Sequence, residues 1–372
     1  MTVNHATEVG RRSHTAAAAL ALVLSAALAT APPASADTTV NCGDTLTADV
    51  TLTADLTCAN GSLTIDAGNV TVDLAGHTLT GVALKMSKHR GLTVKNGTIT
   101  GVEYGLWLLD GTATLSGVRL VGSKVKATGQ TALAVGGTPG TCLLEGAYVI
   151  DGSLTIDNCT VHGAVGAFDG DGVLAVRSSV LTNGSLAVNQ ADNGVITGNV
   201  FDNFPVSVVG DSRNTLLRNN VFKNAGTGLE LDYVSTAAIT VEYNLFTKNS
   251  VGLSVPWRFY NINVRKNLFA GNRVAGMNIY NRFPRLNPYP VSENVFLGNG
   301  HSPGGTTDRA GNPVQGGIHL LVDDPRYPIT LTRNTGAGNA GPLIWAPPGQ
   351  VIDGGGNKGP CAPQPNPDLT CT

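Results

Sequence analysis

Short apolar runs separated by polar turn residues make up most of this chain. The runs are three to five residues long, rich in Val, Ile, Leu, Thr and Phe, and are separated by Gly and Asn. This composition is typical of short β-strands joined by turns. After the first 36 residues, no stretch combines helical spacing of apolar residues with capping residues. The pattern therefore predicts an all-β protein.

One tripeptide, Asn-x-Phe or its close variant, returns throughout the second half of the chain. The steps between successive copies are 21, 24, 23 and 27 residues, and a second Asn follows each copy four or five residues later. Self-similarity at this period indicates stacked structural repeats. The copies begin at Asn199, Asn220, Asn244, Asn267 and Asn294, with a weaker echo at Asn334.

A repeat of about 22 residues with short strands and no helix suits one coil of a parallel β-helix. A leucine-rich horseshoe would need its Leu-x-x-Leu-x-Leu consensus, which this chain lacks. Because side chains alternate along a strand, we expect each Phe to point inward and to stack on the Phe of the next coil. Asn tolerates a left-handed backbone, so we expect the Asn of each phrase at a corner. Stacked Asn side chains can also form hydrogen bonds from one coil to the next.

Two further phrases carry a family resemblance. Residues 73–81 read Asp-Leu-Ala-Gly-His-Thr-Leu-Thr-Gly, and residues 95–101 read Lys-Asn-Gly-Thr-Ile-Thr-Gly. Together with the Asn-x-Phe repeats, they resemble the secreted bacterial right-handed parallel β-helix proteins of the pectin-lyase-like superfamily. The resemblance covers most of residues 40 to 357. It implies a single-stranded right-handed parallel β-helix, and it is nearly silent on activity because these motifs encode coil packing.

The ends of the chain suggest three segments. Residues 1–36 read as a signal peptide, with Arg11 and Arg12 before an apolar run and a small-residue site at Ala34-Ser35-Ala36. Residues 37–358 hold the β-helix, and residues 359–372 form a Pro-rich tail. We therefore predict a secreted protein, with no membrane insertion after the signal is removed, and a monomer.

Six cysteines remain after the signal peptide. An even count in an exported chain reads as disulfides, and six cysteines allow 15 connectivities. Pairing of neighbours in sequence is the simplest and would staple both ends of the β-helix; zinc is the alternative, but no Cys-x-x-Cys supports it. The neighbour pairs are Cys42 with Cys58, Cys142 with Cys159, and Cys361 with Cys371.

The charge balance argues against a nucleic-acid partner. The full chain has 24 basic and 26 acidic residues, and removal of residues 1–36 makes the balance slightly more negative. A nucleic-acid binder would carry a basic excess.

Alignment of the later coils predicts one outward column of side chains. The strand after each Asn corner holds a polar residue between inward apolar residues. Coils lie about 4.8 Å apart, so these residues would form a continuous track. The column would contain Ser207, Glu230, Ser254, Asn278 and His319, with Lys85 and Trp107 on the same face of the N-terminal half.

The turn after that strand is rich in aromatic and charged residues. Between Tyr243 and Ser292 the chain has seven Lys or Arg and no Asp or Glu, which predicts a local positive field. Aromatic rings stack on sugars and Arg binds carboxylate or sulfate, so an acidic polysaccharide is the partner that this composition favours. The expected substrate-binding residues are Trp107, Trp257, Arg258, Asn278 and Asp323.

A plainer interpretation of these residues stays open. Arg265, Lys266 and Arg273 could be ordinary solvated residues at another corner. Trp257 and Tyr280 could pack under a long Gly/Pro/Asp segment, His301 to Gln315, that we expect to project as a loop.

The chain offers two possible chemistries. Hydrolysis needs a carboxylate pair, and Glu230 with Asp232 is a candidate by strand alternation, as is Asp323 with Asp324. Elimination could use Arg258 or Arg282 to neutralise a uronate, with Tyr280 or His319 as the base. The motif set of polygalacturonase-like enzymes is absent, and the only Asp-Asp lacks its neighbours.

A cofactor is not specified by the sequence. Asp169 and Asp171 could hold Ca²⁺, but Asp-Gly-Asp-Gly is also a common turn, so we assign no metal ligand. We predict a protein that binds an acidic polysaccharide along a lateral groove, with cleavage by a lyase or hydrolase reaction left open. The alternative is a non-catalytic envelope, adhesion or structural module.

Overall fold

The computed structural model describes residues 39–138, 140–170, 172–210, 212–232, 238–257, 261–281, 290–323, 326, 328–363 and 366–372, without the side chains of 169, 170 and 281. The predicted signal peptide, residues 1–36, lies outside this part of the chain. Division into signal peptide, β-helix and tail therefore stays a prediction.

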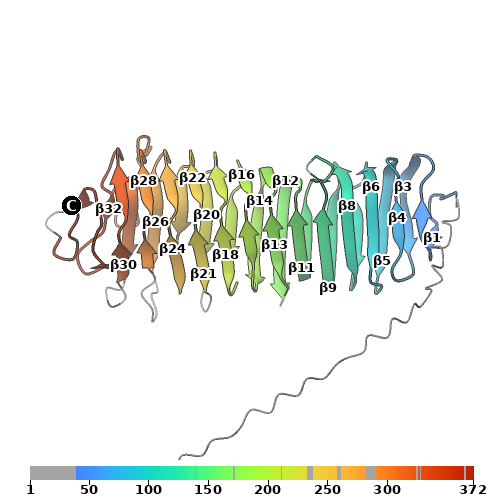
Figure 1. Ribbon diagram of the computed structural model, residues 1–372, viewed down its shortest axis with the longest axis horizontal. Coiled ribbons are helices and arrows are strands. Elements are labelled where there is room, and N and C mark those ends of the chain that lie inside the picture. Colours follow the sequence, from blue (N-terminus) through green and yellow to red (C-terminus); the bar gives the residue numbers. More distant parts are fainter. Residues whose placement is uncertain are drawn as a thin grey trace, which may run out of the picture. The chain divides into compact units, whose positions relative to one another are not determined.

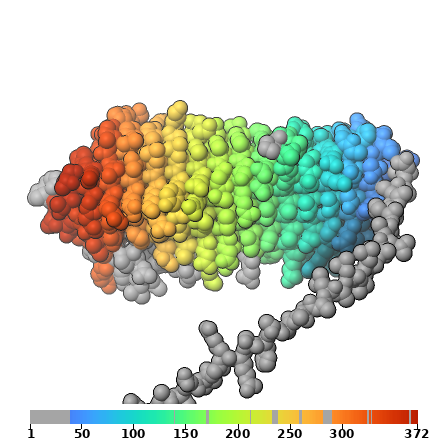
Figure 2. Space-filling view, in the orientation of Figure 1, coloured from blue at the N-terminus to red at the C-terminus, as the bar shows by residue number. Residues whose placement is uncertain are grey.

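The described chain forms a parallel β-helix of about 14 turns, each of about 21 residues, with no helix. Successive turns lie side by side in Figure 1, and Figure 2 shows them as consecutive bands of colour. Strands of neighbouring turns pair in parallel, and Phe222 opposite Phe246 is one example of their register. The predicted fold class and repeat length are confirmed.

Strands of the N-terminal half often continue around a corner, so they are longer than those of the C-terminal half. The N-terminal strands are β1 (Thr45–Leu46), β2 (Val50–Thr51), β3 (Leu56–Ile65), β4 (Thr71–Asp73), β5 (Thr78–Ser87), β6 (Leu92–Thr100), β7 (Tyr104–Leu109), β8 (Thr112–Val121), β9 (Lys124–Gly136), β10 (Leu143–Leu144), β11 (Ala147–Asp157), β12 (Thr160–Gly170), β13 (Leu174–Arg177), β14 (Val180–Ala191) and β15 (Val195–Thr197).

The C-terminal strands are mostly three to seven residues long. They are β16 (Val200–Asp202), β17 (Val206–Val209), β18 (Thr215–Arg218), β19 (Val221–Lys223), β20 (Thr227–Asp232), β21 (Ile239–Glu242), β22 (Leu245–Thr247), β23 (Val251–Val255), β24 (Ile262–Arg265), β25 (Leu268–Ala270), β26 (Ala275–Asn281), β27 (Pro290–Ser292), β28 (Val295–Leu297), β29 (Gly316–Val322), β30 (Ile329–Thr332), β31 (Thr335–Ala337), β32 (Ile344–Trp345), β33 (Val351–Asp353) and β34 (Cys361–Ala362).

Each turn contributes one strand, or rung, to each of three sheets. In the C-terminal half, the first sheet contains β17, β20, β23, β26 and β29, and it is the sheet that carries the predicted site. The second contains β18, β21, β24, β27 and β30, and the third contains β19, β22, β25, β28 and β31.

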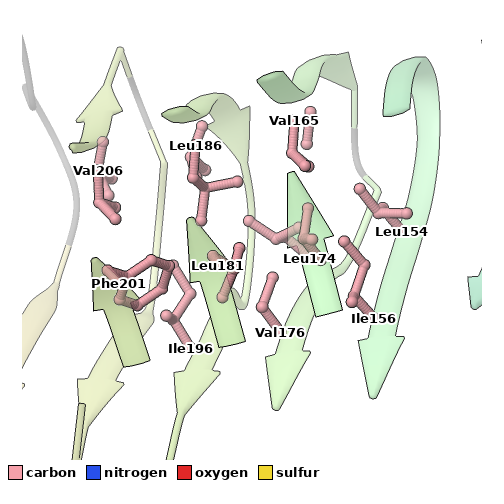
Figure 3. Close-up of a cluster of buried hydrophobic side chains, with 14 of the residues drawn as sticks. Leu154, Ile156, Val165, Leu174, Val176, Leu181, Leu186, Ile196, Phe201 and Val206 are labelled. Carbon is pink, nitrogen blue, oxygen red and sulfur yellow. The ribbon is translucent and has the colours of Figure 1, made fainter. Parts of the chain in front are cut away.

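Inward side chains of the three sheets form one continuous hydrophobic core. Figure 3 shows apolar side chains from successive turns, Phe201 among them, filling the space between the sheets. The predicted phenylalanine column is confirmed: each ring is fully buried, and neighbouring ring centroids lie 5.0, 4.7, 4.7 and 4.7 Å apart. The column consists of Phe201, Phe222, Phe246, Phe269 and Phe296.

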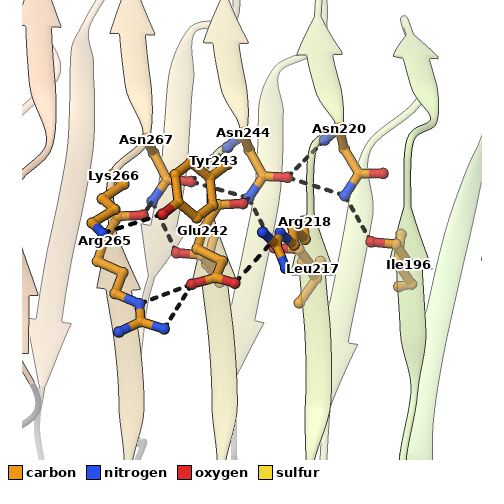
Figure 4. Close-up of polar contacts among 11 residues, drawn as sticks. Ile196, Leu217, Arg218, Asn220, Glu242, Tyr243, Asn244, Arg265, Lys266 and Asn267 are labelled. Atoms are coloured by element: carbon orange, nitrogen blue, oxygen red, sulfur yellow. Dashed lines mark hydrogen bonds and ion pairs between the residues drawn. The ribbon is translucent and has the colours of Figure 1, made fainter.

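The Asn of each phrase forms a buried ladder. Asn244 Oδ1 accepts hydrogen bonds from the backbone N–H and the Nδ2 of Asn220, at 2.9 and 3.0 Å. Asn267 Oδ1 likewise accepts hydrogen bonds from the backbone N–H and the Nδ2 of Asn244. Asn244 Nδ2 also donates to the Leu217 carbonyl (Figure 4). The ladder continues from Asn199 to Asn357. Each amide therefore joins consecutive turns at a position where water has no access.

The expected reason for these Asn residues was partly wrong. Asn244 and Asn267 do not take the left-handed conformation; the residue before each of them does, with φ of 56° at both Tyr243 and Lys266. Asn is selected at the ladder position because its side chain provides both a donor and an acceptor.

A second buried ladder uses the Asn that follows the phrase by five residues. Asn249, Asn272, Asn299 and Asn339 bond to one another in series. Asn203 and Asn224 follow by only four residues, so they fall one position outside this ladder and take φ of 50° and 60° at an exposed corner.

Glycine at the start of the first-sheet strands permits close packing of turns. A Cβ on Gly252 would lie 2.5 Å from the Gly276 carbonyl oxygen and 2.8 Å from the Phe269 ring. No larger residue fits there without displacing the phenylalanine column.

Three disulfides join Cys42 to Cys58, Cys142 to Cys159 and Cys361 to Cys371, which confirms the neighbour pairing. At the C-terminal end, β34 adds a last strand beside β32 and holds the tail against the stack. Disulfides fit an oxidising location such as the periplasm or the cell exterior. No helix in the described part of the chain is long and apolar enough to span a membrane.

Replacement of Asn267 by Ala should lower the free energy of unfolding by about 2–4 kcal/mol, because it removes the buried acceptor of the Asn244 backbone N–H, one acceptor of Asn244 Nδ2 and the donor to the Val241 carbonyl. Chemical denaturation measures this loss. Asn189→Ala, at a half-buried outward position of β14, is the control and should change stability by less than about 0.5 kcal/mol. Equal losses in both variants would contradict the ladder's role.

Candidate functional site

The predicted outward column exists and runs along the whole first sheet. Ser207, Glu230, Ser254, Asn278 and His319 occupy paired positions on consecutive rungs. The column continues toward the N-terminus through Ala187, Gly166, Tyr148, Lys126, Trp107 and Lys85. We use the name ridge for this column together with the next outward position of each strand, which lies two residues further along the chain.

Glu230 and Asp232 lie on the ridge in the same strand, β20. Both are half-buried and separated by one inward residue, Leu231. Alternate residues of a strand lie about 7 Å apart, a spacing that falls within the range of carboxylate pairs in inverting glycosidases. Ser254 and then Asn278 occupy the next rungs beside Glu230.

Tyr280 joins the ridge to two other segments. Its hydroxyl donates to Asp323 Oδ2 at 2.8 Å and accepts from Arg309 Nη1 at 3.1 Å. Trp257 meets the Tyr280 ring edge-on, with centroids 6.5 Å apart. Burial and the bond to Asp323 raise the pKa of Tyr280, although Arg309 opposes the change. A neutral hydroxyl that donates to a carboxylate is better placed as a proton donor than as the base that the sequence suggested.

Residues His301 to Gln315, which we call the strap, lie across the end of the ridge and do not simply project. Asp308 of the strap reaches His319, with 2.9 Å between Oδ2 and Nε2. Val314 packs against Val274 and Ala275. Every residue of β29 is buried, because Ile318, Leu320 and Val322 belong to the core and the strap covers the outward His319.

The expectation that His319 faces solvent was therefore wrong. Its register is as predicted, but the strap covers one side and the Trp345 ring stacks on it at 4.2 Å, so its exposed fraction is 0%. His319 cannot contact a ligand in this conformation, and its role as a base stays a prediction that requires the strap to move.

Burial lowers the pKa of His319, and the nearby Asp308 carboxylate only partly opposes this. Burial alone would raise the pKa of Asp308, but hydrogen bonds from Asn312 and His319 hold it below its usual value. Neutral His319 and ionised Asp308 are thus the states that this arrangement stabilises.

The predicted positive field does not arise from the described cations of residues 243–292. Arg265 pairs with the buried Glu242 at 2.8 Å, together with Arg218 at 3.6 Å, at a corner of the second sheet (Figure 4). Lys266 contacts Tyr243, also shown there, and Arg273 bonds to Ser250. Residues on different sheets of the β-helix face different sides of the molecule. Arg265, Lys266 and Arg273 therefore do not lie on the ridge, in agreement with the plainer interpretation of these residues.

Cations and aromatic rings do gather on and beside the N-terminal part of the ridge, a feature that the sequence analysis found only in part. The basic–aromatic cluster contains Lys85, Tyr104, Trp107, Lys124, Lys126 and Tyr148. The signal missed was the Lys-x-Lys alternation of residues 124–126, which places both side chains on the face of Trp107.

Other predicted groups lie outside the described residues or side chains. These are Arg258, Arg282, Asp324, Asp169 and Asp171. Within the described part of the chain, no three His, Cys, Asp or Glu residues cluster closely enough to hold a metal ion. A Ca²⁺ requirement thus stays open.

A family model described as a right-handed β-helix region matches residues 80–296, more than half of the chain. The chain belongs to this right-handed β-helix family, which confirms the β-helix part of the predicted resemblance. A comparison with curated proteins finds no match.

Solved structures of similar fold include the periplasmic alginate epimerase AlgG, with 11% identity, 90% of this chain and 78% of that chain covered, and a TM-score of 0.34. The AlgE6 A-module, a mannuronan C-5 epimerase of Azotobacter vinelandii, has 13% identity, coverage of 78% and 86%, and a TM-score of 0.29. A PL6 alginate lyase in complex with a trisaccharide has 11% identity, coverage of 80% and 80%, and a TM-score of 0.31. These values carry no argument about substrate or reaction.

The strap should loosen as the pH falls below about 6.5. A displaced His319 has the ordinary pKa of 6.5, whereas covered His319 has a lower one, so protonation favours displacement. Neutral His319 stabilises the closed strap fully above pH 6.5. This stabilisation is lost as the pH falls from 6.5 through the lowered pKa of the covered His319. Protonation of Asp308, whose pKa is held below its usual value of 3.8, destabilises the closed strap further at pH values below 3.8.

Hydrogen-exchange protection factors of the Asp308 and Val314 amides, which both bond within the strap, measure this change at about pH 7.5 and 5.5. His319→Gln is the matched control, and its protection factors should not change over this interval. Equal wild-type protection at both pH values would contradict the assignment.

Proposed function

We propose that this protein binds an acidic polysaccharide along the ridge and cleaves it at the Glu230–Asp232 pair. The observation that supports this most is the register of the ridge, which places outward polar and aromatic side chains on consecutive rungs from Lys85 to Tyr148 and again from Ser207 to Asn278. A linear polymer presents the same groups at regular intervals, so it can contact many rungs at once.

The residues around Glu230 supply contacts of the kind that sugars need. Trp257 is 37% exposed and offers an apolar surface, while Ser254 and Asn278 offer hydroxyl and amide groups. Asp323 and Arg309 hold Tyr280 in place beside them. Carbohydrate sites combine an apolar platform with a few fixed polar groups in this manner.

Hydrolysis is the reaction that these residues favour. The expected separation of the Glu230 and Asp232 carboxylates leaves room for a water molecule between them and the sugar, which implies inversion at the anomeric carbon. Elimination would need a base, and the raised pKa of Tyr280 together with the covered position of His319 argues against both candidates. Arg258 and Arg282 remain proposed ligands of a uronate carboxylate.

The second proposal is a non-catalytic envelope or adhesion module. The covered state of His319 favours it, because the strap removes the only histidine of the described ridge from contact with a ligand. Export and a monomeric state are parts of both proposals, which biochemical fractionation and sedimentation would test. Chelation would test whether either activity requires Ca²⁺.

Reducing-end formation on a panel of uronates and neutral glycans should distinguish the two proposals, with absorbance of new double bonds as the readout for elimination. Glu230→Gln and Asp232→Asn should each lower the hydrolysis rate by at least about 100-fold while glycan binding persists. Binding without any cleavage in the wild type would remove the catalytic proposal and leave the module.

Trp257→Ala should weaken glycan affinity by roughly five- to tenfold, because it deletes the exposed apolar platform. Tyr243→Ala is the matched control, since this ring is 44% exposed but lies on a different corner. Affinity electrophoresis in gels that contain the glycan would measure both. If both variants bind like the wild type, the platform is not used.

A further inference from the structure

The basic–aromatic cluster has no role in the chemistry above and lies on the same ridge. We propose that this cluster is a separate anion-binding subsite, which holds the carboxylate or sulfate groups of an acidic polysaccharide some distance from the Glu230–Asp232 pair. The inference rests on the proposed function, because it assumes a glycan that follows the ridge.

Cations and aromatic rings alternate from rung to rung within the cluster. Along the ridge, Lys85, Trp107, Lys126 and Tyr148 occupy four consecutive rungs. Beside them, Tyr104 is paired with Lys124. Rungs are about 4.8 Å apart, so Lys85 and Lys126 are about 10 Å apart along the ridge, as are Trp107 and Tyr148. Charges repeated at such an interval match a polymer with anionic groups on regularly spaced units.

The aromatic rings position the ammonium groups. Lys126 Nζ lies 5.2 Å from the Trp107 ring centroid and 5.7 Å from that of Tyr104. Lys124 Nζ lies 6.0 Å from the centroid of Tyr148, one rung further. Cation–π contacts at these distances restrict a flexible side chain while leaving its other donors available to an anion.

The outward positions of this part of the first sheet are positively charged, although Asp110, Glu145 and Asp151 lie at its corners. Within the described residues, the outward first-sheet positions from Lys85 to Ile150 include three lysines and no Asp or Glu. Glu103 lies at the margin, and its hydrogen bond to the Tyr104 hydroxyl raises the pKa of that tyrosine. An anion at the lysines therefore meets an attractive field.

A polysaccharide suits this surface better than a membrane. Trp107, Leu109 and Ile150 are only 43%, 39% and 37% exposed, because they lie on the surface of a sheet. Membrane-binding proteins bury their apolar residues several ångströms into the bilayer, which these positions do not allow. A polymer that lies flat on the sheet needs no such projection.

The cluster and the carboxylate pair are separated by a neutral stretch. From Tyr148 the ridge passes Gly166, Ala187 and Ser207 before Glu230, which is about 19 Å at the rung spacing. A glycan must be long enough to span this stretch before it can use both zones. A glycan long enough to reach both zones should therefore bind much more tightly than a short one, because its two ends are held at once.

The test compares two triple variants of the full chain that lose the same charge. Lys85→Gln/Lys124→Gln/Lys126→Gln removes the cluster, and Lys223→Gln/Lys248→Gln/Lys266→Gln removes three lysines from other surfaces. Circular dichroism and thermal unfolding confirm that both fold. Calorimetry then measures binding of polygalacturonate, dextran sulfate and neutral dextran at two salt concentrations, and of short and long oligogalacturonates.

We expect the cluster variant to bind polygalacturonate or dextran sulfate on the order of tenfold more weakly, with a shallower salt dependence and no preference for long chains. The control variant should stay within about twofold of the wild type. If the cluster variant retains wild-type affinity while Trp257→Ala weakens binding, the inference fails and the proposed function stands.

If the wild type binds none of these glycans, the proposed function itself fails. Binding of vesicles that contain phosphatidylserine, without binding of either anionic glycan, would overturn the inference in favour of a lipid surface. Adding Trp107→Ala to the cluster variant, with a further loss of affinity for the anionic glycans, would support a direct contribution of the aromatic ring.

Discussion

Registration of each turn on the turn before it is the constraint on which the rest of this structure depends. Buried asparagine amides impose it, because each one must satisfy a backbone group and the amide of the next turn at the same time. A slip of one residue would leave these groups unpaired and would turn the phenylalanines toward solvent. Apolar burial drives the stacking, but it is the directional hydrogen bonds that select one register.

The same registration turns sequence distance into spatial proximity on the outside. Residues about 20 positions apart become neighbours on the ridge, so a site can extend over many rungs without any deep cavity. Small residues at Gly166 and Ala187 divide this ridge into a basic N-terminal zone and a C-terminal zone with carboxylates. The division matters physically, because a polyanion is attracted to the first zone, whereas Glu230 and Asp232 would repel it unless they act on the bound chain.

Basic residues have different partners on different sheets of this molecule. Glu242 is buried between Arg218 and Arg265, and Lys266 contacts Tyr243 beside them, so these cations serve local structure. The lysines of the basic–aromatic cluster have aromatic partners and no carboxylate on the described outward positions around them. The strap adds a further layer, since a histidine on the ridge becomes an interior residue once fifteen residues fold over it.

The even number of cysteines and the pairing of sequence neighbours predicted the disulfides. The repeat was sufficient to predict the β-helix, the inward Phe246 and its equivalents, and the outward alignment of Glu230 with Asn278. These features follow from alternation and period, which are local properties of a chain. Sequence could not reveal that His319 is covered by the strap or that Arg265 pairs with the buried Glu242. Each of these depends on where a loop folds back or on which corner a turn begins, and both are decided by packing between turns.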